Sequence, residues 1–160
     1  MLIIGNSGSG KTMLLFKLLL ENYFDLDRIV FVSTSLSQKQ YEVIIKSFQK
    51  GLSINQIRTL FEQQKQITNI DSALDIITSN DKFKSSKLKV VEFKHPDHIL
   101  LPNELNPRKV KRILVIIDYC TIINSDNPTH SFVFGKPLNI NTIYLSQKYT
   151  KVPCTIRNFF

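Results

Sequence analysis

The feature that most constrains this chain is a glycine-rich segment close to its start. An apolar run over residues 1–4 precedes it, and an apolar run of helical length over residues 13–20 follows it. The segment matches the pattern G-x-x-x-x-G-K-[ST] and consists of Gly5, Asn6, Ser7, Gly8, Ser9, Gly10, Lys11 and Thr12. A strand, a glycine-rich turn and a helix in this order are the context in which the pattern binds phosphate groups. The sequence therefore predicts a nucleotide site where a buried strand meets a helix that begins near Lys11.

Each part of this segment has an expected role. Backbone amides curled by the glycines and the dipole of the following helix both favour an anion. We expect Lys11 to reach the β- and γ-phosphates and the Thr12 hydroxyl to take one position on Mg²⁺. A flexible Gly/Ser turn with a solvated lysine is the weaker interpretation of the same residues.

Charge and composition narrow the class of protein. The 160 residues fit one globular domain over 1–160, and their net charge of +8 favours polyanionic partners, nucleic acid first. Cys120 and Cys154 lack the spacing of a zinc site or a disulfide framework, which indicates a reduced, intracellular setting. Lys11 and Lys17 interrupt the N-terminal apolar run, and no stretch is long enough to span a bilayer. We therefore expect a soluble protein with no membrane partner.

The order of the apolar runs predicts an α/β fold. Hydrophobic patterning predicts, in chain order, a helix ending near residues 22–24, a strand over 28–33, a helix over 37–48 closed by Gly51, a helix capped by Ser53, a helix over 71–79 and a strand over 89–94. Because a helix separates the first two strands, they form a βαβ unit and a parallel sheet. The lysines of the strand over 89–94 place it at an edge. We expect a mostly parallel sheet flanked by helices.

Two polar segments carry weaker signals. His95, Asp97 and His98 are potential metal ligands, but they surround an X-Pro turn with no evident further ligands, so a solvated loop is favoured. Residues 107–112 are the densest basic cluster, which suits nucleic-acid backbone, a nuclear import signal or a merely solvated loop. The cluster directly precedes a strand, whereas ligands of open parallel sheets bind at the carboxyl ends of the strands. We therefore expect it to lie away from the triphosphate.

Two later strands end in polar residues that complete the predicted site. Residues 113–117 are apolar and close on Asp118, the pattern of a Walker B strand whose carboxylate holds Mg²⁺. Residues 140–147 form another short strand, which finishes on the polar pair Ser146 and Gln147. If this strand lies between the phosphate-loop strand and the Walker B strand, Gln147 comes close to the γ-phosphate and can orient the attacking water. Otherwise Gln147 hydrogen-bonds a neighbouring loop.

These motifs together resemble a family. The chain is similar to the FtsK-HerA group of P-loop ATPases and, within it, to the genome-packaging ATPases of poxviruses, giant viruses, virophages and Polinton-like elements. The resemblance rests on the segments 5–12, 116–120, 139–149 and 152–158. It implies a RecA-like sheet whose last strand is missing here, and ATP with Mg²⁺ hydrolysed at the subunit interfaces of a homo-oligomeric ring. It further implies translocation of double-stranded DNA into a capsid, with capsid proteins as partners and a virion or virus assembly site as the location.

The chain departs from that family at two positions. The family usually has a second acidic residue after the metal-binding aspartate, and this chain has Tyr119, whose phenol is a poor base at neutral pH. Either another carboxylate, such as Asp126, acts as the base, or hydrolysis is slow or absent. Lys136 stands where relatives often have arginine, which leaves Arg157 as a candidate for a finger acting in trans. An ATP-binding protein without hydrolysis and a small nucleotide kinase remain alternatives, whereas a GTPase is disfavoured because no N-K-x-D motif is present.

Overall fold

The computed structural model describes residues 1–21, 26–63, 67–79, 88–118 and 126–160. Its strands are β1 (Leu2–Ile4), β2 (Arg28–Ser33), β3 (Lys89–Phe93), β4 (Ile113–Asp118) and β5 (Ile140–Ser146). Its α-helices are α1 (Lys11–Leu20), α2 (Lys39–Lys50), α3 (Ile54–Gln63), α4 (Ile70–Ser79), α5 (Pro102–Leu105), α6 (Asp126–Phe134) and α7 (Cys154–Arg157). Short 3-10 turns are η1 (Pro96–His98), η2 (Lys136–Leu138) and η3 (Tyr149–Lys151).

The five strands form one sheet in the order β1-β5-β4-β2-β3, and every neighbouring pair is parallel. This confirms the predicted α/β fold with a parallel sheet. β3 lies at one edge, as its lysines indicated, and β1 at the other edge of the described sheet. β5 lies between β1 and β4, with Ile4 in register with Ser146 and Asp118 in register with Leu145. The carboxyl ends of these three strands therefore meet at one edge of the sheet.

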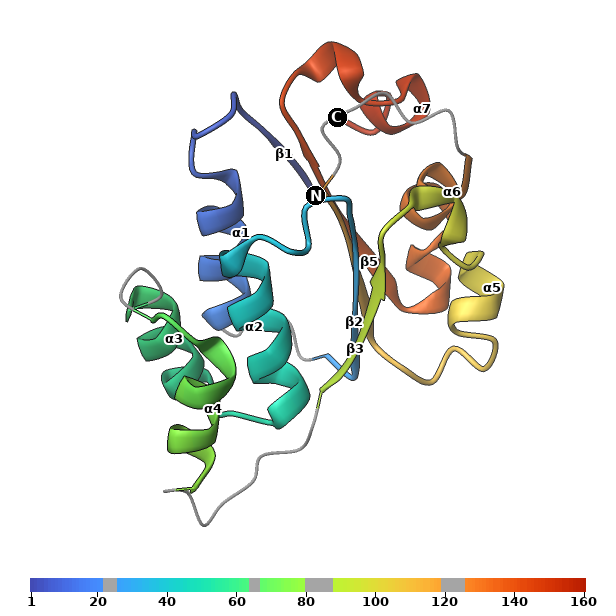
Figure 1. Cartoon of the computed structure of the whole chain (residues 1–160). Coiled ribbons are helices and arrows are strands. Elements are labelled where there is room, and N and C mark those ends of the chain that lie inside the picture. Colours follow the sequence, from blue (N-terminus) through green and yellow to red (C-terminus); the bar gives the residue numbers. More distant parts are fainter. Residues whose placement is uncertain (22–25, 64–66, 80–87, 119–125) are drawn as a thin grey trace.

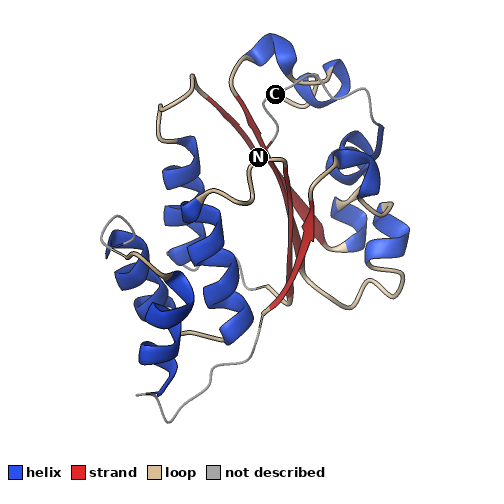
Figure 2. Ribbon diagram, viewed as in Figure 1, coloured by secondary structure: helices blue, strands red, loops and turns tan. Residues whose placement is uncertain are grey.

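Helices cover both faces of the sheet (Figures 1 and 2). The helices α1 to α4 pack on one face, and α5 and α6 lie on the other. Strands buried on both faces are apolar at every position. Along β4, Leu114 and Ile116 accordingly belong to the core under α1 to α4, whereas Val115 and Ile117 belong to the opposite core. This explains why β2 and β4 could be recognised from continuous apolar runs.

Helix boundaries follow local chemistry. α1 ends at Leu20, before the predicted end near residues 22–24, and residues 22–25 lie outside the described part of the chain. α2 begins at Lys39, two residues later than predicted, because the Gln38 N–H donates to the Ser35 carbonyl in a preceding turn. Gly51 ends α2 in the left-handed conformation, at φ 74°, as predicted. No helix among the described residues is long and apolar enough to cross a membrane.

Ser53 stands before α3 and makes the predicted cap. The Gln56 N–H donates to Ser53 Oγ at 3.4 Å, and Gln56 Oε1 accepts from the Ser53 N–H at 2.7 Å. This reciprocal arrangement is a capping box, which satisfies two N–H groups at a helix start. The helix predicted over 71–79 also forms, and it begins at Ile70 rather than Asp71.

Candidate nucleotide site

The glycine-rich segment forms a tight loop between β1 and α1. The loop continues from the sheet, because the Gly5 N–H donates to the Ser146 carbonyl of β5 at 3.1 Å. Gly8 and Gly10 have φ angles of 76° and 85°, a left-handed conformation that side chains with a Cβ rarely adopt. At Gly5 the crowding is different, since a Cβ there would lie 2.4 Å from Ser9 Oγ and that hydroxyl would have to move. The glycines thus permit a curl that other residues would resist.

The start of α1 presents backbone donors beside this curl. Leu14 donates its N–H to the Gly10 carbonyl at 2.8 Å, which is the first bond of the helix. The N–H groups before it, on Lys11, Thr12 and Met13, belong to the first turn, where an α-helix supplies no partner of its own. The Lys11 ammonium donates to the Gly5 carbonyl at 2.7 Å and to the Asn6 carbonyl at 2.9 Å. An ammonium has three donors, so one is left to meet a phosphate oxygen.

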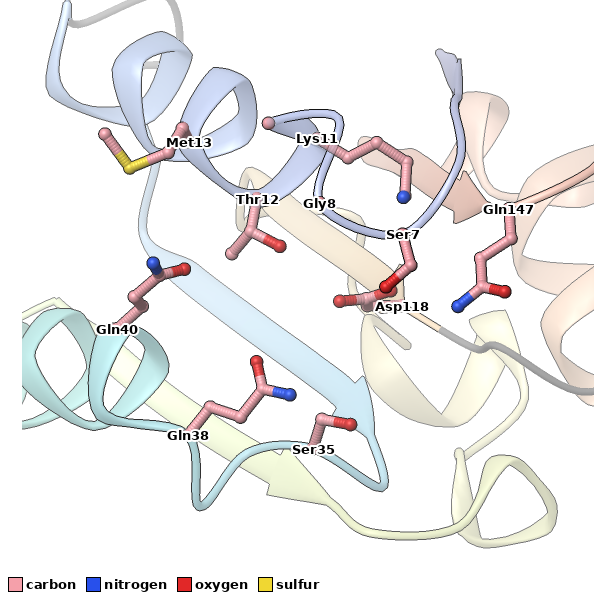
Figure 3. Close-up of a pocket in the computed structure, with 11 residues that line it drawn as sticks. Ser7, Gly8, Lys11, Thr12, Met13, Ser35, Gln38, Gln40, Asp118 and Gln147 are labelled. Carbon is pink, nitrogen blue, oxygen red and sulfur yellow. The ribbon is translucent and has the colours of Figure 1, made fainter.

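The start of α1 and the Lys11 side chain line a cavity of about 320 Å³ at the carboxyl edge of the sheet. Figure 3 shows Lys11, Thr12, Asp118 and Gln147 directed into the same space. The full lining consists of Ser7, Gly8, Gly10, Lys11, Thr12, Met13, Ser35, Gln38, Gln40, Asp118 and Gln147. Of the predicted phosphate-loop residues, Gly5, Asn6 and Ser9 do not line the cavity and instead build the loop behind it. The structure therefore brings both predicted strand ends and the phosphate loop to one place.

Gln147 reaches the cavity because of the strand order. It follows β5, which lies between the phosphate-loop strand β1 and the strand β4 that ends on Asp118. The turn after β5 is held by Ser146, whose hydroxyl donates to the Lys148 carbonyl at 2.9 Å. The condition on which the predicted position of Gln147 depended is met. Its role toward an attacking water stays a prediction.

Asp118 has a partner that the sequence did not reveal. The Tyr41 hydroxyl donates to Asp118 Oδ2 at 2.5 Å, from α2 to the end of β4. The Tyr41 ring is fully buried and packs edge-on against Phe16 of α1 and Phe31 of β2, at centroid distances of 5.3 and 6.0 Å. The carboxylate orientation is therefore set by a residue that three elements hold in place.

Burial is the main electrostatic influence on this carboxylate. It raises the pKa of Asp118 above its ordinary value, and the Tyr41 hydrogen bond and the Lys11 charge oppose that rise. A partly buried carboxylate of this kind is stabilised by a cation. The Thr12 hydroxyl and the Asp118 carboxylate are oxygen donors, which Mg²⁺ prefers, and Mg²⁺ commonly takes only one or two protein ligands together with substrate phosphates. The residues present fit a magnesium–nucleotide complex.

The segment that follows β2 lines the side of the cavity across from the phosphate loop. Ser35, Gln38 and Gln40 approach from the start of α2, across from the phosphate loop (Figure 3). The Ser35 N–H donates to Ser33 Oγ at 3.0 Å, which turns the chain at the end of the strand. No motif marks these residues. The only sequence signal for them was their place directly after a strand that proved to neighbour β4.

The other predicted polar residues are not among the described residues that line the cavity. Among the described lining residues Asp118 is the one carboxylate, and Tyr119 lies outside the described residues. Asp126 is the first residue of α6, and its side chain is not described. The Arg157 guanidinium donates to Cys154 Sγ at 2.7 Å and lies 5.5 Å from the Tyr149 ring centroid, so it is engaged within its own chain and does not line the cavity.

The remaining candidate ligands do not form a metal centre. His95 Nδ1 lies 3.1 Å from Asp97 Oδ2 on an exposed turn beside η1. No group of three or more His, Cys, Asp or Glu side chains suited to a metal ion occurs in the part of the chain that the structure describes. Lys136, in η2, is exposed and outside the cavity lining.

Comparison with known proteins gives a fold-level likeness. No family model matches the chain, and no curated protein matches it. Among solved structures it is similar to an ATPase domain, with a TM-score of 0.45, 16% identity, and coverage of 98% of this chain and 62% of that one. A DnaB-like replicative helicase, solved in a study of its interactions with primase, gives a TM-score of 0.41 and 16% identity over 98% of this chain and 43% of that one. The chain thus spans less than two thirds of either structure, and similarities this distant assign neither a family nor an activity.

Proposed function

We propose that this chain is the nucleotide-binding and hydrolysing domain of an ATP-driven motor. The observation that carries the proposal is the convergence of Lys11, Thr12, Asp118 and Gln147 in one cavity. Lys11 and Thr12 come from the phosphate loop, whereas Asp118 and Gln147 come from the ends of two strands much later in the chain. If the G-x-x-x-x-G-K-[ST] match were accidental, Asp118 and Gln147 would not be expected to lie beside it.

Each residue has a distinct task in this proposal. The amides at the start of α1 and the Lys11 ammonium bind the β- and γ-phosphates and stabilise the charge that develops between them. Thr12 and Asp118 hold Mg²⁺, which when bound neutralises phosphate charge. Tyr41 orients Asp118. Gln147 positions the attacking water, since its side-chain amide can hydrogen-bond the water without taking up its proton.

A second candidate is an ATP-binding protein with little hydrolysis. It is supported by one observation, namely that Asp118 is the only carboxylate among the described lining residues and already accepts a bond from Tyr41. A general base is then lacking unless another acid reaches the cavity.

A second part of the proposal concerns the substrate that the motor moves. We propose translocation of double-stranded DNA by a homo-oligomeric ring, as in the FtsK-HerA genome-packaging ATPases, with capsid proteins as further partners. The motif resemblance described above supports it, and so does the net charge of +8, which favours a polyanion. A nucleotide kinase is the less favoured alternative.

One set of assays tests these proposals together. ATP hydrolysis is measured with and without duplex DNA, alongside binding of a fluorescent ATP analogue and the molecular mass in solution. We expect Lys11→Ala to lose nucleotide binding and Asp118→Asn to lose Mg²⁺-dependent turnover. DNA-stimulated hydrolysis that persists in Lys11→Ala would refute the motor. Tight nucleotide binding without turnover in the wild type would select the non-hydrolysing candidate.

A further inference from the structure

The loop that joins α5 to β4, residues 107–112, is a second charged feature of the chain. All of its side chains are exposed: Pro107, Arg108, Lys109, Val110, Lys111 and Arg112. The loop enters β4 at Ile113, whereas the cavity lies at Asp118, the other end of the same strand. In Figure 1 it follows α5 around the end of the sheet opposite α7. An anion bound by this loop does not compete with the triphosphate for space.

A buried asparagine holds the loop at its base. Asn106 is only 3% exposed, and its Nδ2 donates to the carbonyls of Lys111 and Leu138, both at 2.7 Å. Its Oδ1 accepts from the Lys111 N–H at 3.4 Å. These bonds join the two ends of the loop to each other and to the η2 turn. The backbone is therefore fixed although the side chains are in solvent.

The tip of the loop is held in an unusual conformation. Lys109 has φ 54°, in the left-handed region that non-glycine residues seldom occupy. Its N–H donates to the Asn106 carbonyl at 3.1 Å, and its own carbonyl accepts from Asn139 Nδ2 at 2.6 Å. Unfavourable backbone conformations persist where their surroundings over-determine them, and they concentrate at functional sites. A loop that only connects two elements has no need of this clamp.

Acidic neighbours neutralise little of the charge. Asp27 accepts the Arg112 N–H at 2.7 Å and lies 3.5 Å from Arg112 Nε. The backbone hydrogen bond from Arg112 is the main cause that lowers the pKa of Asp27, and the charges of Arg112 and Lys111 lower it further. Within the described residues, Arg108 and Lys109 have no ion pair. The loop consequently presents a fixed excess of positive charge.

We propose that the 107–112 loop is a preformed site for the phosphate backbone of duplex DNA, an inference that rests on the DNA partner of the proposed function. Guanidinium groups match phosphate oxygens in a two-pronged geometry, and a fixed backbone lowers the entropy lost on binding. A lipid surface is less suited to this loop, which offers one apolar side chain, Val110, and no amphipathic helix. The contacts are to phosphates, so binding is independent of DNA sequence.

The test compares two variants that lose the same charge. The loop variant is Arg108→Gln/Lys109→Gln/Lys111→Gln, and the control is Lys17→Gln/Lys39→Gln/Lys50→Gln on α1 and α2, which lie across the sheet from α5. Anisotropy of a labelled duplex is measured in EDTA without nucleotide, over about 50 to 200 mM salt. Three lost phosphate contacts make the log–log salt slope shallower by about 2 to 3 in the loop variant, with a much smaller change in the control.

A further variant separates conformation from charge. Asn139 itself has φ 56°, a conformation that glycine also adopts. Asn139→Gly therefore keeps the backbone and every cation but removes the bond to the Lys109 carbonyl. We expect it to bind duplex about fivefold more weakly with an unchanged salt slope, which is the effect of about one hydrogen bond. Wild-type affinity in this variant would show that the loop needs no clamp and would overturn the preformed site.

The remaining outcomes are also decisive. Equal losses in the loop and control variants would show that only overall charge matters, which overturns this inference and leaves the proposed ATPase standing. A wild type that binds no duplex removes the DNA partner itself. Binding to phosphatidylserine vesicles that only the loop variant loses, with DNA binding intact, assigns the loop to lipid and also overturns the inference. Nucleotide binding is expected to be the same in all three variants and the wild type.

Discussion

Replacement of Tyr41 by phenylalanine is the sharpest test of the proposed Mg²⁺ site. Tyr41→Phe removes one hydroxyl and keeps the ring that packs against Phe16 and Phe31. The lost bond is a hydrogen bond to a partly buried carboxylate, and bonds of this class contribute about 1.5 to 3 kcal/mol. If this free energy serves to orient Asp118 for Mg²⁺, its loss weakens Mg²⁺ binding by about 10- to 100-fold, the range typical of residues that support metal ligands.

The assay separates the metal from the nucleotide. Binding of a fluorescent ATP analogue is measured first in EDTA and then over a Mg²⁺ titration. We expect Tyr41→Phe to match the wild type in EDTA, since the phosphate loop is untouched, and to need about 10- to 100-fold more Mg²⁺ for half-maximal effect. A purely structural role for Tyr41 would change the melting temperature and leave the Mg²⁺ titration unaltered.

Tyr144 provides a matched control. It is also fully buried, but it belongs to the core on the opposite face of the sheet and does not line the cavity. Burial raises its pKa to about 12, so it is uncharged at any working pH and Tyr144→Phe likewise removes a neutral hydroxyl. Mg²⁺ titrations that coincide for Tyr41→Phe and Tyr144→Phe would refute the reasoning.

Three further predictions concern the fold and the phosphate loop. Asn106→Ala removes the hydrogen-bond partner of two carbonyls and one N–H, so it should lower the free energy of unfolding by about 2 to 3 kcal/mol, measured by urea denaturation. An unchanged urea midpoint would show that Asn106 does not hold the base of the 107–112 loop. Gly10→Ala must place a Cβ residue at φ 85°, so nucleotide affinity should fall at least tenfold by fluorescence titration, whereas the exposed Ser9→Ala should bind normally. The pKa of Asp27 is lowered in the folded state, so its stabilising effect is complete above its unfolded pKa and is lost as pH falls through the folded value. In a plot of melting temperature against pH, Asp27→Asn should therefore lose less stability at acid pH than the wild type. Parallel curves for the two proteins would count against the Arg112 pairing.

Local patterns predicted most of the scaffold. The strands β2 and β4 have the predicted bounds because continuous apolar runs closed by polar residues leave little choice of boundary. The phosphate loop was recognisable because its chemistry requires glycines and a lysine at fixed spacing. The cap at Ser53 and the left-handed Gly51 were predictable for the same reason, since each depends on residues only a few positions apart.

Contacts between distant residues could not be predicted in this way. Tyr41 fits the apolar period of α2 and is buried, but that period does not predict which group its hydroxyl contacts. Its partner Asp118 is 77 positions away, and the two meet only because β2 and β4 are neighbours. Asn106 was hidden in the same manner, as a polar residue within an apparent loop that proved to be buried. Pairing order within the sheet decides the contact between Tyr41 and Asp118, and hydrophobic periodicity does not encode that order.

The length of β4 has a consequence for how two anions can share this small domain. Five steps along a parallel strand of about 3.3 Å each separate Ile113 from Asp118 by roughly 16 Å. The Debye length at physiological ionic strength is about 8 Å, roughly half of this separation. Salt therefore screens the part of the repulsion between the two proposed anions that acts through the surrounding solvent, whereas the buried strand between them excludes salt. In the proposed arrangement this stiff spacer, apolar up to its final aspartate, keeps a polyphosphate and a phosphodiester chain at opposite ends of one strand.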